Sequence, residues 1–136
     1  MSGPRDTIRK SMQRFKDRMF IIAVNSALYE CADAVRAEAF QSISRGSASG
    51  KGHKPSPAGE PPNRDTGHLQ ANLETSQPKP MTARVTSKAE YAAALEFGTS
   101  NMAARPYMRP ARDKVRPRAV KILRRRVKDA TKRRNT

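Results

Sequence analysis

Residues 91–110 read YAAALEFGTSNMAARPYMRP, and their composition differs from that of the surrounding chain. An apolar run from Tyr91 to Phe97 is stopped by Gly98-Thr99 and followed by two Arg-Pro pairs. Apolar residues alternate within the run, although its alanines would also suit a helical turn; the abrupt stop favours a strand. We therefore expect a strand here, with Phe97 closing the core and Gly98 supplying the turn.

The two Arg-Pro pairs predict a stiff segment, because a residue that precedes proline is held extended. They would present Tyr107 and Met108 at fixed positions. An aromatic ring and a methionine on such a segment suit either the core or a contact with another subunit, and the sequence leaves both open. The predicted subunit or partner interface comprises Glu96, Phe97, Gly98, Thr99, Arg105, Pro106, Tyr107, Met108, Arg109 and Pro110.

The earlier part of the chain divides into three patterns. Residues 5–45 contain neither proline nor glycine, and apolar side chains recur every three or four positions. This spacing predicts one long helix, or two helices in line that meet at a phase change near residues 22–25. Residues 46–67 are rich in Gly, Pro and Ser and predict a long loop. Alternation over 69–76 and 81–86 predicts a β-hairpin.

A second helix is predicted after Pro110, with that proline at its first position and a kink or a delayed start at Pro117. Residues 131–136 are expected to be an unstructured basic tail. The whole chain, residues 1–136, is then a single α+β domain. Its long N-terminal helix and basic C-terminal helix would pack on a small, mainly antiparallel sheet of about three strands. Only 36% of the residues are hydrophobic, so we expect part of the chain to gain order from a partner.

Positive charge is concentrated at one end. The formal net charge is +16, and 14 of the 28 Lys and Arg residues lie in residues 104–136, beside only two acids. Such a segment indicates an acidic partner: nucleic acid, an anionic membrane surface or an acidic protein. The run MFIIAV, residues 19–24, is too short to span a bilayer, so we expect a soluble chain without a membrane partner.

The residue types needed for catalysis or metal binding are scarce. The chain has two histidines, His53 and His68, and one cysteine, Cys31, which excludes an internal disulfide and suits a reducing cytoplasm. A zinc site needs about four ligands at short paired spacings. No sequence signature of a nucleophile with its base appears either. These patterns argue against an enzyme, a metal and a cofactor.

The basic C-terminal helix has two interpretations that the sequence supports equally. Its cations would contact the phosphate backbone of DNA, or they would form a solvated face that meets acidic neighbours in an assembly. No aromatic residue follows position 110 to stack on bases. The candidate contact residues are Arg116, Arg118, Lys121, Arg124, Arg125, Arg126 and Lys128.

Two motifs together resemble a known family. Tyr-Ala-x-x-Leu-Glu-Phe-Gly-Thr from Tyr91, followed by Ala-Arg-Pro-Tyr-Met-Arg-Pro-Ala from Ala104, is similar to the signature of the small head–tail connector proteins of long-tailed bacteriophages and prophages. Pro57-Ala58-Gly59-Glu60-Pro61-Pro62 and the turn Thr66-Gly67-His68-Leu69 resemble a second segment of that family. The resemblance covers roughly residues 11–125. Two departures are the unusually basic C-terminal extension and Tyr107, where the family more often has Phe.

The resemblance implies a structural virion protein without enzymatic activity. Such a neck, or tail-completion, protein forms a ring, a hexamer, at the junction of head and tail. It would bind the head-closure ring on one side and the tail terminator or tail tube on the other, with DNA passing through its channel. It would be assembled in the cytoplasm of the host bacterium. The alternatives are a tail terminator ring that caps the tail tube and a small basic nucleic-acid-binding protein.

Overall fold

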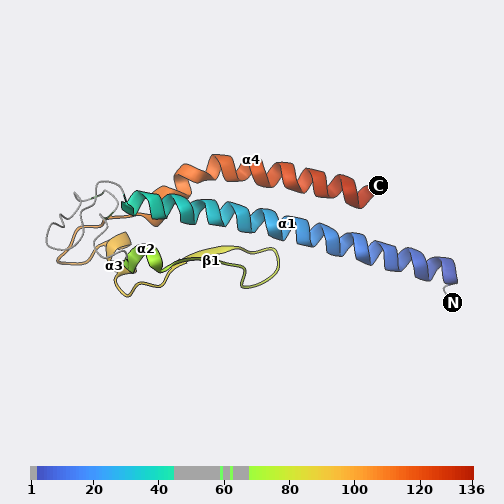
Figure 1. Ribbon diagram of the computed structural model, residues 1–136, viewed down its shortest axis with the longest axis horizontal. Helices are drawn as coiled ribbons and strands as arrows, with labels where there is room; N and C mark the ends of the chain where they lie inside the picture. The colour runs from blue at the N-terminus through green and yellow to red at the C-terminus, as the bar shows by residue number, and fades with distance from the viewer. Residues whose placement is uncertain (1–2, 45–58, 60–61, 63–67) are drawn as a thin grey trace.

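The computed structural model describes residues 3–44, 59, 62 and 68–136 (Figure 1). The predicted loop over 46–67 lies outside the described residues, apart from Gly59 and Pro62. The predicted mixture of a long N-terminal helix, a C-terminal helix and an antiparallel sheet is confirmed. The elements are α1 (Pro4–Ser44), α2 (His68–Ala71), β1 (Leu73–Ser76), β2 (Arg84–Ser87), α3 (Ala92–Phe97) and α4 (Met108–Asn135).

Helix α1 is one continuous helix of 41 residues, which decides between the two predicted arrangements. Pro4 occupies its first position, where the missing N–H costs nothing. The phase change near residues 22–25 does not interrupt the helix. Instead, Asn25 is hydrogen-bonded to the segment between β1 and β2. Its backbone carbonyl accepts a hydrogen bond from Gln77 Nε2, and its Oδ1 accepts one from the Met81 N–H, both at 2.7 Å.

Helix α4 runs antiparallel to α1 along much of its length (Figure 1). Three ion pairs link the two helices at 2.8–2.9 Å: Lys114–Glu38, Arg126–Glu30 and Arg134–Asp17. Between them, the half-buried Cys31 thiol donates to the Ala119 carbonyl at 3.4 Å, and burial raises the pKa of this thiol. Helix α4 continues to Asn135, so residues 131–135 are helical where the sequence predicted an unstructured tail.

In the part of the chain that the structure describes, the sheet has two strands, and the prediction of about three was wrong. Strands β1 and β2 pair antiparallel, with Leu73 opposite Ser87 and Ser76 opposite Arg84. The predicted hairpin is therefore confirmed, but its strands are shorter than the predicted 69–76 and 81–86, and residues 81–83 precede β2. Residues 69–71 belong to α2 rather than to the first strand. The predicted third strand is helix α3, because consecutive alanines favour a helix and the alternation of such small side chains does not compel a strand.

The core lies around the C-terminal end of α1. Its buried members come from the end of α1, from the elements between the two long helices and from the start of α4, and its largest fully buried side chains are Tyr107 and Ile43. Val35, Leu95 and Met108 pack against the cluster from its edge. The cluster consists of Ala39, Ile43, Leu69, Leu73, Ala89, Ala92, Tyr107 and Ala111.

Candidate functional site

Glu96 holds the start of α4. Its Oε2 accepts hydrogen bonds from the backbone N–H groups of Tyr107 and Met108, at 2.9 and 3.0 Å, and its Oε1 accepts one from Arg109 at 2.9 Å. The first N–H groups of a helix have no partner within the helix, and the helix dipole favours a negative charge beside them. Glu96 therefore acts as a cap supplied by α3, eleven or more residues earlier in the chain.

Gly98 makes the turn that brings Glu96 to that position. It adopts φ +76°, and a Cβ built on it would lie 2.9 Å from the Ala104 nitrogen and 3.0 Å from the Met102 oxygen. Thr99 and Met102 then pair their backbones across a tight turn. The Arg105 N–H donates a hydrogen bond to the Leu95 carbonyl at 2.6 Å, so the segment that follows Gly98 folds back against α3.

The aromatic residues of this segment are placed differently from the prediction. Phe97 does not close the core: 82% of it is exposed, and Tyr91 is also exposed. Tyr107 is the residue that fills the core, with 1% exposed, and burial raises the pKa of its hydroxyl. Met108 is half-buried against the same cluster. Tyr107 is therefore a core residue of its own chain, whereas Met108 packs at the edge of that core and also lines an open hollow. A contact between Met108 and another subunit stays a prediction.

The remaining residues of the predicted interface divide in two. Arg105 and Pro106 are half-buried beside α3, whereas Arg109 and Pro110 are exposed in the first turn of α4. Pro110 is the third residue of that helix rather than its first, which a proline tolerates equally because this N–H has no partner within the helix. Phe97 and Arg109 border a hollow of about 700 Å³, whose apolar lining includes Val35, Val85 and Met108.

The two motifs identified in the sequence meet in the structure. The Gly59 N–H donates to the Ala104 carbonyl at 2.9 Å, and Gly59 adopts φ +85°. Pro62, from the same motif, is buried. The segment from Ala104 is therefore held by α3 through Leu95 and by the earlier motif through Gly59.

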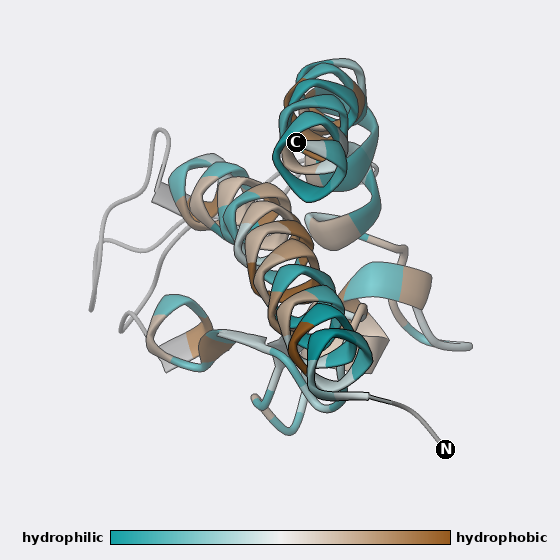
Figure 2. Ribbon diagram, turned by 90° about the vertical axis from the view of Figure 1, so that its right-hand side faces the viewer, coloured by the Kyte–Doolittle hydropathy of each residue, from teal (hydrophilic) through white to brown (hydrophobic). Residues whose placement is uncertain are grey.

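The predicted basic residues all lie on the exposed surface of α4. Of the seven, Arg126 is the one that forms an ion pair within the described part of the chain, with Glu30. Five cations of α4 follow one another at steps of three and four, so they share one face over about 21 Å. We call this set the basic stripe; it consists of Arg118, Lys121, Arg125, Lys128 and Lys132. Figure 2 shows how hydrophilic α4 is in comparison with α1.

Sequence reasoning missed an apolar surface on α1. Ile8, Met12, Phe15 and Met19 belong to the periodic pattern that predicted the helix, and such a pattern normally marks the face that packs on the core. Here 48–64% of each of these residues is exposed. The apolar spacing is visible in the sequence, but it does not show that α4 and the hairpin cover other faces of α1.

Neither a metal site nor a membrane span is evident in residues 3–44 and 68–136. No group of three or more His, Cys, Asp or Glu in this part of the chain could hold a metal ion, and His53 lies outside it. None of the described helices is both long and apolar enough to cross a bilayer. Comparisons of the chain with models of protein families, with curated proteins and with solved structures find no match.

Proposed function

We propose that this chain is a structural subunit of the head–tail junction of a long-tailed bacteriophage or prophage. In this role it assembles into a ring, a hexamer, that joins the head-closure ring to the tail terminator or tail tube. The proposed role is structural rather than catalytic, and the hydrogen bonds of Glu96 agree with a structural role. This carboxylate, at the centre of the signature motif, caps α4.

The observation that carries the proposal is the presentation of Phe97. Phe97 is 82% exposed, the highest value among the exposed large hydrophobic residues of the described chain, although the chain has little apolar material for its core. Phe97 ends α3, with Glu96 bonded to α4 on one side and the Gly98 turn on the other. A fixed, exposed aromatic beside an apolar hollow is suited to burial in the centre of an interface between subunits.

The contact between Gly59 and Ala104 gives further support. The two motifs that carry the resemblance lie far apart in the sequence, yet a hydrogen bond joins them. The residues of both motifs therefore contribute to the same local structure. On the surface of that structure, Phe97 and Arg109 are exposed. A subunit that must present the same contact to each neighbour in a closed ring requires such a fixed arrangement.

Mass measurement of the purified chain, followed by electron microscopy, tests this proposal. We expect a ring, and we expect the substitution Phe97→Ser to release folded monomers, because the side chain contributes little to the fold of its own subunit. Density for the chain at the neck of intact particles would locate it, whereas density at the end of the tail tube would favour the tail terminator role. A chain that stays monomeric and is absent from particles would refute both roles.

A second candidate function, binding to duplex nucleic acid, is favoured by the basic stripe. Each phosphate that a cation neutralises contributes about 0.9 to the slope of log affinity against log salt concentration. The slope is negative, and replacement of Lys121, Arg125 and Lys128 by Gln should reduce its magnitude by about 2.7 if all three contact DNA. Point substitutions are preferable to truncation of α4, because Ala130 and other residues of its inner face are buried. Binding by the monomer favours this function, and binding by the ring alone favours DNA passage through a connector.

A further inference from the structure

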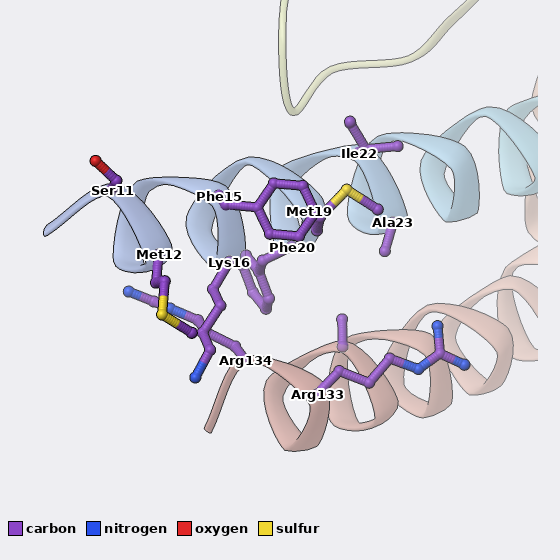
Figure 3. Close-up of a pocket in the computed structure, with 11 residues that line it drawn as sticks. Ser11, Met12, Phe15, Lys16, Met19, Phe20, Ile22, Ala23, Arg133 and Arg134 are labelled. Atoms are coloured by element: carbon purple, nitrogen blue, oxygen red, sulfur yellow. The ribbon is translucent and has the colours of Figure 1, made fainter. Parts of the chain in front are cut away.

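An apolar groove of about 680 Å³ lies between the N-terminal half of α1 and the C-terminal end of α4 (Figure 3). Met12, Phe15, Met19 and Phe20 line it from α1, and Arg133 and Arg134 line it from α4. The Arg134 guanidinium lies over the ring of Phe20, 5.5 Å from its centre. The groove therefore combines an apolar floor with a cationic wall.

The floor of the groove continues as a stripe along α1. Its five side chains are 60, 57, 64, 48 and 52% exposed in chain order, and they follow one another at steps of four and three residues. That alternation is the spacing of a coiled-coil seam, in which side chains pack against a second helix lying alongside. We call this set the α1 seam; it consists of Ile8, Met12, Phe15, Met19 and Ile22.

The first part of the seam also extends beyond the neighbouring helix. The end of α4 lies beside Lys16 and Asp17, through the contacts Lys16–Thr136 and Arg134–Asp17. Residues 4–15 thus project past α4, for about 18 Å at the rise of an α-helix (Figure 1). Most helical stability in proteins comes from packing of an apolar face, so an additional helix against the seam would stabilise the projecting turns.

The charges beside the seam identify the chemistry of that helix. Arg9 and Lys16 flank the seam on one side, and Arg18 flanks it on the other. Residues in these positions of a coiled coil select the partner, because they meet the flanking residues of the facing helix. Positive flanks together with the cationic wall of the groove require negative charges on the occupant.

We propose that the α1 seam and the adjoining groove bind an amphipathic helix of a partner protein, with apolar side chains on one face and acidic residues on both flanks. This site is separate from Phe97 and from the basic stripe, and the inference does not depend on the proposed function. The occupant adds a third helix beside α1 and α4, with its apolar face on the seam and its carboxylates beside Lys16, Arg18 and Arg133.

A second copy of this chain is a poorer occupant. Two seams facing one another would place their flanking cations together, and like charges in these positions are destabilising. The chain has few acids to offset this, because most of those described are used internally. Ion pairs within the chain engage Asp6, Asp17, Glu30, Asp33, Glu38, Glu74 and Asp113. An anionic lipid surface would satisfy the cations, but a groove between two helices fits a rod better than a plane.

Titration of the full chain with labelled synthetic peptides tests the proposal. The probe is a helix of about three heptads with Leu at the seam positions and Glu at the flanks. One control peptide has Lys at the flanks, and another keeps Glu but has Ser at the seam positions. At physiological salt we expect the Leu–Glu peptide to bind at least about tenfold more tightly than either control. The substitution Phe15→Ser should weaken it at least about tenfold, as expected for a central apolar anchor.

Two variants separate this site from general attraction to a basic protein. Phe97→Ser removes an even more exposed aromatic residue elsewhere and should leave peptide affinity unchanged, although it should disrupt the proposed ring. Lys16→Glu combined with Arg18→Glu should reverse the preference toward the Lys-flanked peptide. Equal binding of the Leu–Glu and Ser–Glu peptides would overturn the proposal. So would Phe15-dependent binding to anionic phospholipid vesicles, or Phe15-dependent self-association, that the Leu–Glu peptide does not displace.

Discussion

Substitution of Glu96 tests how the Tyr91–Thr99 motif stabilises the fold. Its carboxylate accepts three backbone hydrogen bonds at the start of α4, at 2.9, 3.0 and 2.9 Å. Loss of a single-residue helix cap costs about 0.5–2 kcal/mol, and the interaction of a charge with the helix dipole adds about 0.3–1 kcal/mol. Because this carboxylate satisfies three donors rather than one, we expect Glu96→Ala to lower the free energy of unfolding by about 3 kcal/mol.

The isosteric substitution Glu96→Gln separates charge from shape. A Gln side chain keeps one oxygen for Tyr107 and Met108, but it turns an amide N–H₂ group toward the Arg109 N–H. We expect a loss of about 1.5 kcal/mol, half that of the Ala variant, because one acceptor and the negative charge are lost. In a chain of this size, each kcal/mol lowers Tm by about 3–5 °C, so the two variants should melt roughly 10 and 5 °C below the native chain.

Thermal unfolding followed by circular dichroism provides the assay, and Glu90→Gln provides the matched control. Glu90 is exposed, and its substitution makes the same change in net charge elsewhere on the chain. Amide hydrogen exchange adds a local measurement, since the N–H groups of Tyr107, Met108 and Arg109 should lose protection before the rest of α4. If Glu96→Gln and Glu90→Gln melt at the same temperature, the role assigned to Glu96 is wrong.

Three further outcomes are expected. Gly98→Ala should destabilise the fold by about 2 kcal/mol in urea unfolding, because it places a Cβ in a left-handed turn against Ala104, whereas Gly3→Ala, with open space around it, should not. Tyr107→Ala should cost about 3–5 kcal/mol and Phe97→Ala less than about 0.5 kcal/mol in the same assay, and the reverse order would return Phe97 to the core. Hydrogen bonding to Arg36 lowers the pKa of Asp33, so its contribution is present above the usual carboxyl pKa of about 3.9 and is lost as the pH falls through the lower folded value. The stability advantage of the native chain over Asp33→Asn should therefore narrow on acidification, and a gap independent of pH would contradict this.

The helices could be predicted from the sequence because their signals are local. Residues 5–45, without Pro or Gly and with apolar side chains every three or four positions, leave few alternatives to a helix. The hairpin could also be predicted, since alternation on both sides of a Pro-containing break is a local pattern too, but the same alternation extended the predicted strands beyond the observed ones. What failed was the segment Tyr91–Phe97, where alanine fits both periods and the decision depends on distant partners.

The candidate site was less predictable, because its arrangement depends on contacts between distant parts of the chain. The sequence identified Glu96, Gly98 and Tyr107 as unusual, but it could not show that Glu96 reaches the start of α4. Nor could it show that Tyr107, rather than Phe97, enters the core. Similarly, the periodic apolar residues before Ile22 indicate a face without telling which element, if any, covers it.

The ion pairs between α1 and α4 have a directional consequence. In each of the three pairs that link the helices, α1 supplies the acid and α4 the base. Partly exposed pairs of this kind add little to stability individually. A shift of one helix by a single turn, however, would displace all three by about 5.4 Å at once. The three ion pairs together thus favour one register between the two alanine-containing helix surfaces. This register also determines how far the N-terminal end of α1 extends beyond α4.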